Sequence, residues 1–225
     1  MKKSIFTLTM AILLTFAGTL YAQNISLGIA AKASTTGLGG DVVVRFHERM
    51  TARVGYDKLA YNRSFLFEES GIEYDVNAAI NAGAILALYD FYLSDIVFVS
   101  AGLGINNFNI NAKGLAVSGL PWGDITIPAE RVGNFEFDVK PGLSATPYLG
   151  IGFGRTLGKE KSLAFAFELG SYYQGEPKVT IESSGLIAPT SNPDFGQKDL
   201  LEGQISQYYL FPVLKFNLSY RILSL

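Results

Sequence analysis

Apolar and polar residues alternate along most of the chain with a period of two. The clearest stretch is residues 72–88, where one face is apolar and the other begins with Glu73 and Asp75. The apolar face carries Ile72, Tyr74, Val76, Ala78, Ile80, Ala82, Ala84, Leu86 and Leu88. Such alternation predicts a β-strand. The stretch exceeds the usual strand length of about 5–6 residues and suits a membrane crossing, which needs about 9–11.

The same pattern recurs and predicts eight strands, over residues 24–34, 38–47, 50–66, 72–90, 95–112, 143–156, 162–182 and 207–223. The alternation loses phase near Lys58 and near Asn106-Asn107, which predicts β-bulges. Along each strand the apolar face is expected to meet lipid.

The connections between the predicted strands support a membrane barrel. Strands 2–3, 4–5 and 6–7 are joined by short polar turns, whereas the long connections 113–142 and 183–206 both follow odd-numbered strands. Outer-membrane barrels have even strand numbers, short periplasmic turns and longer outer loops. The sequence therefore predicts an all-β fold, an eight-stranded antiparallel transmembrane up-and-down β-barrel. Residues 197–207 are expected to form a short helix in an outer loop.

The N-terminus predicts export. A basic start at Lys2 and Lys3 is followed by an apolar run over residues 5–17 and a small residue, Ala22. This is the layout of a secretory signal peptide, and the run is shorter than the roughly 20 apolar residues that a spanning helix needs. We expect a signal peptide over 1–22 and an outer-membrane barrel over 23–225.

Composition excludes several function classes. Removing Lys2 and Lys3 leaves 16 basic residues against 20 acidic ones, a net charge of -4. The Lys and Arg residues are not clustered, so the sequence gives no indication of nucleic-acid binding. The chain has no Cys, which excludes disulfides, cysteine nucleophiles and thiolate metal sites. The expected partners are outer-membrane lipid, the barrel-assembly machinery and small solutes.

Ten charged residues fall on the polar faces and are expected to point inward. Five are basic and five acidic: Lys32, Arg45, Arg53, Lys215 and Arg221, with Asp41, Asp57, Glu73, Asp75 and Glu168. Eight strands leave an interior that side chains just fill, and buried charges must pair. We therefore expect a lumen-lining salt-bridge network that plugs the barrel. Two interpretations remain open, namely mutual neutralisation without transport and a narrow polar path for a charged solute.

Enzymatic chemistry and cofactors are not expected. The glycines of residues 150–154 suggest a phosphate loop, but they lie within a strand rather than before a helix, so small inward-facing residues are the preferred interpretation. The single histidine, His47, lies at a short turn with no clear nucleophile beside it. Asp194 and Asp199 in the outer loop could hold a weak Ca²⁺, but their spacing is not diagnostic.

Four segments together resemble a known family. They are STTGLGG (34–40), TPYLGIGFG (146–154), FELGSYYQGEPKV (167–179) and FPV (211–213). In this order they resemble the carbapenem-associated outer-membrane protein family, also described as ornithine-uptake porins. The resemblance implies an eight-stranded monomeric barrel, passage of small basic amino acids and no catalytic residues. The long loops do not match, and loops would set the choice of solute.

Three functions are therefore compared. The first is a narrow uptake or permeability barrel for small solutes, with basic amino acids as the candidate class. The second is a structural or adhesive barrel that displays residues 113–142 and 183–206 outward and has a plugged interior. The third is a soluble secreted barrel that encloses a ligand.

Overall fold

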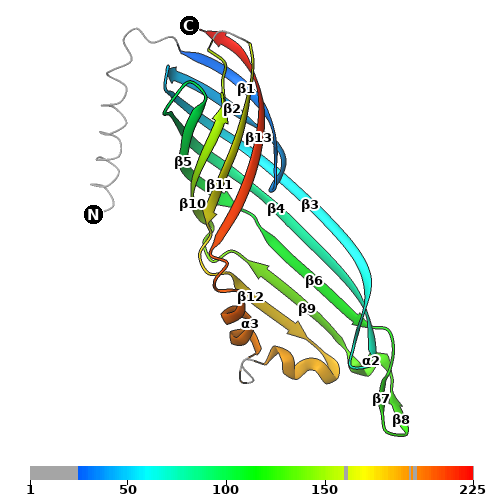
Figure 1. The fold of residues 1–225 in the computed structure, drawn as a ribbon. Coiled ribbons are helices and arrows are strands. Elements are labelled where there is room, and N and C mark those ends of the chain that lie inside the picture. Colours follow the sequence, from blue (N-terminus) through cyan, green and yellow to red (C-terminus); the bar gives the residue numbers. More distant parts are fainter. Residues whose placement is uncertain (1–24, 160–161, 193, 195–196, 225) are drawn as a thin grey trace, which may run out of the picture.

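The computed structural model describes residues 25–159, 162–192, 194 and 197–224, so the predicted signal peptide lies outside the described residues. Within them, eight strands pair antiparallel in a closed ring (Figure 1). In ring order they are β1 (Ser26–Ser34), β2 (Gly37–His47), β3 (Met50–Glu69), β4 (Ile72–Tyr92), β5 (Val97–Asn106), β10 (Ala145–Gly154), β11 (Leu163–Tyr173) and β13 (Leu210–Ser224). The predicted eight-stranded barrel is confirmed.

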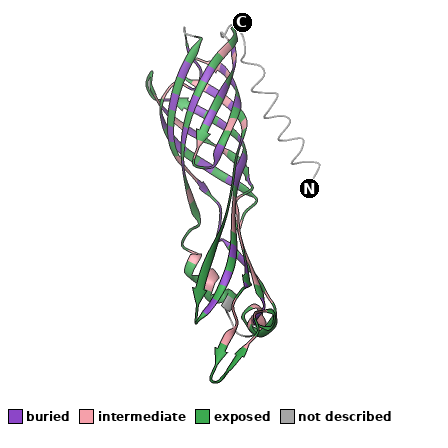
Figure 2. Cartoon of the chain, turned by 90° about the vertical axis from the view of Figure 1, so that its right-hand side faces the viewer, coloured by how far each residue is buried: buried purple, intermediate pink, exposed green. Residues whose placement is uncertain are grey.

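Buried and exposed residues alternate along the barrel strands (Figure 2). On β13, Lys215, Asn217 and Ser219 are buried, whereas Phe216 and Leu218 between them are exposed. On this strand apolar side chains thus point outward and polar ones inward. A closed ring pairs its backbone groups between strands, which is what a lipid environment requires of β-structure.

Beyond the barrel, β3 and β4 continue into a second sheet, here called the extension sheet. Its strand order is β3-β4-β6-β9-β12, with β6 (Asn109–Ala116), β9 (Asn134–Lys140) and β12 (Lys178–Ser183). The remaining elements are a hairpin of β7 (Leu120–Trp122) and β8 (Ile125–Ile127), and the helices α2 (Ala129–Val132), η1 (Gly185–Ser191) and α3 (Gln197–Ile205). Among the described helices, none is long and apolar enough to cross a membrane.

The extension sheet corrects three sequence predictions. The predicted strand 95–112 divides into β5 and β6, because the Asn106 side chain accepts a hydrogen bond from the Phe108 amide at 2.9 Å and turns the chain. The predicted strand 162–182 divides into β11 and β12 at Gly175, where φ is +69°, and Pro177. The connection 113–142 contains β9 and is not an open loop. The predicted helix at 197–207 is confirmed as α3.

The loss of phase near Lys58 is not a bulge. The β3–β4 register runs without a shift from Met50 to Glu69. Instead, the pairing of β2 with β3 ends at Lys58, opposite Leu38. Beyond this point β3 leaves the barrel wall and forms an edge of the extension sheet, so the alternation in burial ends.

The orientation predicted for residues 72–88 was wrong. Ala84, Leu86 and Leu88 face the barrel interior, where they pack with Tyr148, Tyr172 and Val213. Ile72, Tyr74 and Val76 face the same way in the extension sheet and pack with Ala116 and Val132. The period of two was correct, but the apolar face is the buried one. Glu73 and Asp75 on the opposite face are exposed.

Candidate functional site

Arg53, on β3, forms an ion pair that crosses the barrel interior. Its Nη2 lies 2.6 Å from Glu168 Oε2 on β11 and 2.8 Å from Asp90 Oδ1 on β4. In the ring, β3 and β11 are separated by three strands on either side, so they form opposite walls. The ion pair between Arg53 and Glu168 therefore spans the barrel interior from one wall to the opposite one.

Four further ion pairs extend this contact. Lys32 Nζ lies 2.7 Å from Asp41 Oδ1 and 3.4 Å from Asp57 Oδ2. Arg53 Nη1 lies 3.7 Å from Asp41 Oδ2, and Lys215 Nζ lies 3.5 Å from Glu168 Oε1. Every side chain involved is at most 3% exposed. The charge cluster, as it is called below, comprises Lys32, Asp41, Arg53, Asp57, Asp90, Glu168 and Lys215.

Neutral side chains complete the cluster's hydrogen bonds. The Tyr148 hydroxyl donates to Glu168 Oε1 at 2.6 Å, and its ring centre lies 3.4 Å from Lys215 Nζ in a cation–π contact. Asp90 accepts from the Ser100 hydroxyl at 2.7 Å and from the Thr156 hydroxyl at 3.0 Å. These bonds offset part of the desolvation cost of the buried carboxylates.

Inward glycines make room for this network. A Cβ on Gly170 would lie 2.1 Å from the Tyr148 hydroxyl oxygen, and one on Gly152 would lie 2.1 Å from the Phe98 ring. The bare backbone is therefore needed where an aromatic side chain from a neighbouring strand crosses it. The interpretation of the glycines in residues 150–154 as small inward residues is confirmed.

The structure brings six of the ten predicted inward charges into the cluster: Lys32, Asp41, Arg53, Asp57, Glu168 and Lys215. Arg45 is buried at the barrel end that carries the short turns, where it donates to the Gly158 carbonyl at 2.8 Å and the Ser26 hydroxyl at 2.9 Å. Arg221, also at that end, donates to the Gly158 and Lys159 carbonyls.

The other two predictions, Glu73 and Asp75, are corrected. Both lie exposed on the extension sheet, outside the barrel interior, because the face of β4 that they share continues the outer surface of the barrel. Sequence reasoning also missed Asp90. Asp90 lies an even number of residues from Leu86 and Leu88, so the inward face of β4 includes it once the direction of that face is known.

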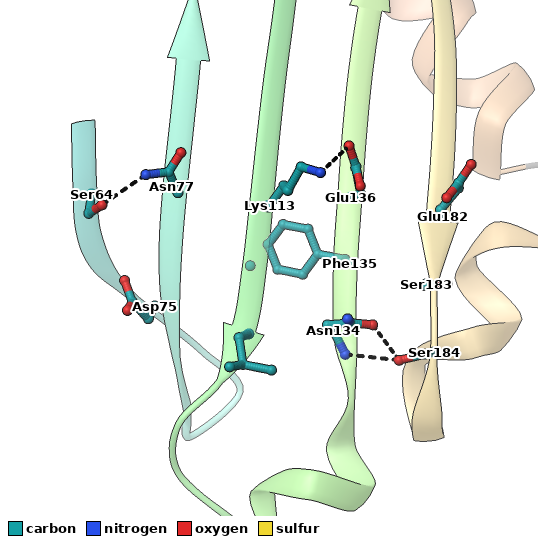
Figure 3. A pocket seen from close by; sticks show the side chains of 12 residues that line it. Ser64, Asp75, Asn77, Lys113, Asn134, Phe135, Glu136, Glu182, Ser183 and Ser184 are labelled. Carbon is teal, nitrogen blue, oxygen red and sulfur yellow. Dashed lines mark hydrogen bonds and ion pairs between the residues drawn. The ribbon is translucent and has the colours of Figure 1, made fainter. Parts of the chain in front are cut away.

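The outer face of the extension sheet carries a polar row that crosses its five strands (Figure 3). Ser64, Asn77, Lys113, Glu136 and Glu182 are successive cross-strand neighbours. They line part of an open hollow of about 580 Å³. Lys113 Nζ lies 2.9 Å from Glu136 Oε1. This face can therefore hydrogen-bond to polar groups in the surrounding solvent.

The pKa of Glu136 tests whether Lys113 and Glu136 of this polar row are in contact. Hydrogen bonds from Lys113 and then Asn111 lower the Glu136 pKa below its ordinary value of 4.5. These contacts therefore stabilise the folded state above that pH and lose their effect as the pH falls through the lowered pKa. In a carboxyl-carbon NMR titration, we expect Lys113→Met to raise the Glu136 midpoint toward 4.5, whereas Lys178→Met should leave it unchanged. An unchanged midpoint in Lys113→Met would contradict the contact.

The two remaining candidates lie apart from the cluster. His47 Nδ1 accepts a hydrogen bond from the Arg49 amide at 3.1 Å in the β2–β3 turn. Asp194 and Asp199 are exposed, and the described residues contain no group of three or more His, Asp or Glu side chains placed to hold a metal ion.

A closed eight-stranded ring, an apolar outer surface and a charged, filled interior define an outer-membrane β-barrel protein. Solved structures agree. The chain is similar to Acinetobacter baumannii CarO2, with a TM-score of 0.58 and 20% identity over 89% of this chain and 100% of that one. It is also similar to CarO of the same organism, with a TM-score of 0.56 and 20% identity over 88% and 98%. No protein-family model and no curated protein matches the sequence. The similarity to these two solved structures confirms, at the level of the fold, the family resemblance noted in the sequence.

Proposed function

We propose that this protein is a narrow, gated uptake barrel for small solutes, with basic amino acids as the preferred class. The observation that carries the proposal is the Arg53–Glu168 contact of 2.6 Å between opposite walls. A solute can pass this point only if it separates the two side chains. The charge cluster is therefore the barrier and also the group that selects the solute.

An amino acid can replace both partners of this contact. Its carboxylate can pair with Arg53 while its ammonium pairs with Glu168, so neither buried charge is left without a partner as the solute passes. The cluster holds three basic and four acidic side chains, Asp90 being the fourth acid. This excess carboxylate favours a second positive charge on the solute. A neutral sugar offers none of these pairings and must leave buried charges unpaired.

Liposome swelling tests the proposal. Vesicles that contain the wild-type protein are expected to swell faster in lysine than in leucine, a zwitterion of similar size, and faster in leucine than in arabinose. Glu168→Ala should remove this order and admit arabinose, because the barrier is lost. Asp75→Ala, on the outer face of the extension sheet, should behave as the wild type does. If wild-type vesicles do not swell in any solute, whatever its size, the proposed uptake function is contradicted.

The polar row on the extension sheet supports a second candidate, a structural or adhesive barrel with a permanently closed interior. Its five strands hold Lys113 and Glu136 outward, away from the barrel. In that case cells that display the protein should adhere to a surface more than cells that carry a Lys113→Glu variant, while the vesicles stay impermeable. Adhesion that is equal in the two strains would count against this candidate.

A further inference from the structure

The far half of β3 is an unpaired edge of the extension sheet. β2 pairs with β3 only as far as Lys58, whereas β4 pairs with β3 up to Glu69. Within the part of the chain that the structure describes, no other strand pairs with residues 59–69. All of these residues are exposed, and β3 forms one side of the extension sheet in Figure 1. Such an edge presents unpaired backbone groups to which another strand can bind.

The free backbone groups of this edge belong to every second residue. The Glu73 carbonyl on β4 accepts a hydrogen bond from the Val117 amide at 2.8 Å, so it points away from β3. Glu73 lies opposite Glu68. Two facing residues of an antiparallel ladder either bond to each other or both point away, so Glu68 turns its N–H and C=O to the open edge. Because the register has no shift, the same holds for Ala60, Asn62, Ser64 and Leu66.

The two edges of the extension sheet differ in their protection. At the β12 edge, the Val179 amide donates to Glu202 Oε1 of α3 at 3.0 Å, so a helix covers part of that edge. Residues 59–69 of β3, in contrast, contain no proline, no lysine and no bulge. These are three of the features by which proteins usually prevent a sheet edge from pairing. The β3 edge is therefore open to a further strand.

The side chains of this edge are complementary to a second copy of the same strand. Antiparallel pairing about a two-fold axis at Leu66 puts Arg63 opposite the partner's Glu69 and Phe65 opposite the partner's Phe67. Opposite charges and aromatic pairs are both favourable across strands. An axis at Arg63, Ser64 or Phe65 would instead put Arg63 opposite another arginine or a phenylalanine. The register at Leu66 also lets free backbone groups meet free backbone groups, because Ser64 then faces the partner's Glu68.

Phe65 and Phe67 supply apolar surface for this pairing. They are 45% and 44% exposed, although they lie beside Val76 and Tyr74, which are buried on the same face of the sheet. A second strand beside β3 would cover part of both rings, and the burial of apolar area favours association. The edge therefore offers backbone hydrogen bonds, apolar surface and complementary charges to the same partner.

We propose that this protein binds a second copy of itself through residues 63–69 of β3, in an antiparallel pairing that joins the two extension sheets. Because the paired strands are antiparallel, the two barrels lie at opposite ends of the joined sheet, which suits two membranes that face each other. Each barrel remains a monomer within its own membrane. The interface shares no residue with the charge cluster, so a failure of this association is distinguishable from a failure of the proposed uptake.

Nanodiscs that each carry one copy of the full-length protein test the pairing. Two populations with donor or acceptor dyes on their lipids are mixed, and energy transfer between discs measures association. Wild-type discs are expected to associate, whereas empty discs are not. Arg63→Glu and Glu69→Arg should each weaken association about 10-fold or more, because two like-charge pairs replace two attractive ones. Glu182→Arg, at an exposed position on β12 at the opposite edge, should associate as the wild type does.

Mixing the two single variants tests the register directly. Discs with Arg63→Glu carry two acidic residues at the paired positions, and discs with Glu69→Arg carry two basic ones. The two kinds should therefore associate with each other more strongly than either does with itself. If this mixture associates no better than the single variants alone, the proposed register is wrong and the proposal is overturned.

A further variant tests the backbone pairing. Leu66→Pro removes an N–H that faces the open edge and not β4, a position where a strand tolerates proline. It should abolish association, while the heat-modifiable gel shift shows that the barrel is still folded. Association that persists in Leu66→Pro overturns the proposal. Wild-type discs that stay separate also overturn it, in favour of a strand from another protein.

Discussion

Replacing Glu168 by Gln is expected to lower the free energy of unfolding by about 3–5 kcal/mol, the usual cost of removing one partner from a buried ion pair. Glu168 is fully buried and contacts Arg53 at 2.6 Å and Lys215 at 3.5 Å. The neutral amide leaves both cations short of a negative charge, and an amide is a poorer acceptor for Tyr148. Urea unfolding in lipid vesicles, followed by the heat-modifiable gel shift, measures the change.

Two variants control this experiment. Glu73→Gln makes the same chemical change at an exposed site and should alter stability by no more than about 0.5 kcal/mol. Adding Lys215→Met to Glu168→Gln should recover part of the loss, since one unpaired cation is removed. Equal effects of Glu168→Gln and Glu73→Gln would show that the cluster does not stabilise the barrel.

Gly152→Val is expected to destabilise the barrel by about 1–3 kcal/mol, the usual cost of overpacking an interior. A Cβ at this position would lie 2.1 Å from the Phe98 ring, which is fully buried. Phe98 packs on Tyr92 with ring centres 5.2 Å apart, so it cannot move without disturbing a second aromatic side chain. The fraction of folded, heat-modifiable protein after refolding into detergent micelles measures the effect.

The same assay separates overpacking from a general intolerance of valine. Gly203→Val places the side chain in open space on α3 and should not destabilise the protein, since valine has a slightly better helix propensity than glycine. Because Phe98→Ala itself removes a buried side chain, the effect of Gly152→Val is compared in the two backgrounds. Gly152→Val should cost less in the Phe98→Ala background than in the wild type, since the smaller side chain frees the contested space. An equal cost in both backgrounds would show that the contact with Phe98 is not the cause.

The sequence predicts the barrel well because its signal is local. On seven of the eight predicted barrel strands, the apolar face identified from the sequence points outward, as on β13, where Phe216 and Leu218 are exposed. The inward face of residues 72–88 was predicted wrongly because both faces of β4 carry apolar residues. Leu86 points inward to the core, while Ile85 is 48% exposed on the outside. Alternation fixes the two faces but not which of them is buried.

The charge cluster was only partly predictable. Lys32, Arg53 and Glu168 follow from alternation on clear strands. The inward position of Asp90 does not follow in this way, because Asp90 lies between two aromatic residues, Tyr89 and Phe91, at the end of its strand. The extension sheet was also missed. Its pairing of β6 with β9 and of β9 with β12 joins segments that are distant in the chain, and such pairing leaves no local pattern in the sequence.

Planar-bilayer conductance tests most directly whether the charge cluster closes the barrel. Purified wild-type protein in potassium chloride is expected to give no steady open-channel current, because Arg53 and Glu168 join opposite walls of the interior. Glu168→Ala should give discrete channel openings, and Asp75→Ala should stay silent as the wild type does. A steady open-channel current from the wild-type protein would contradict a closed interior.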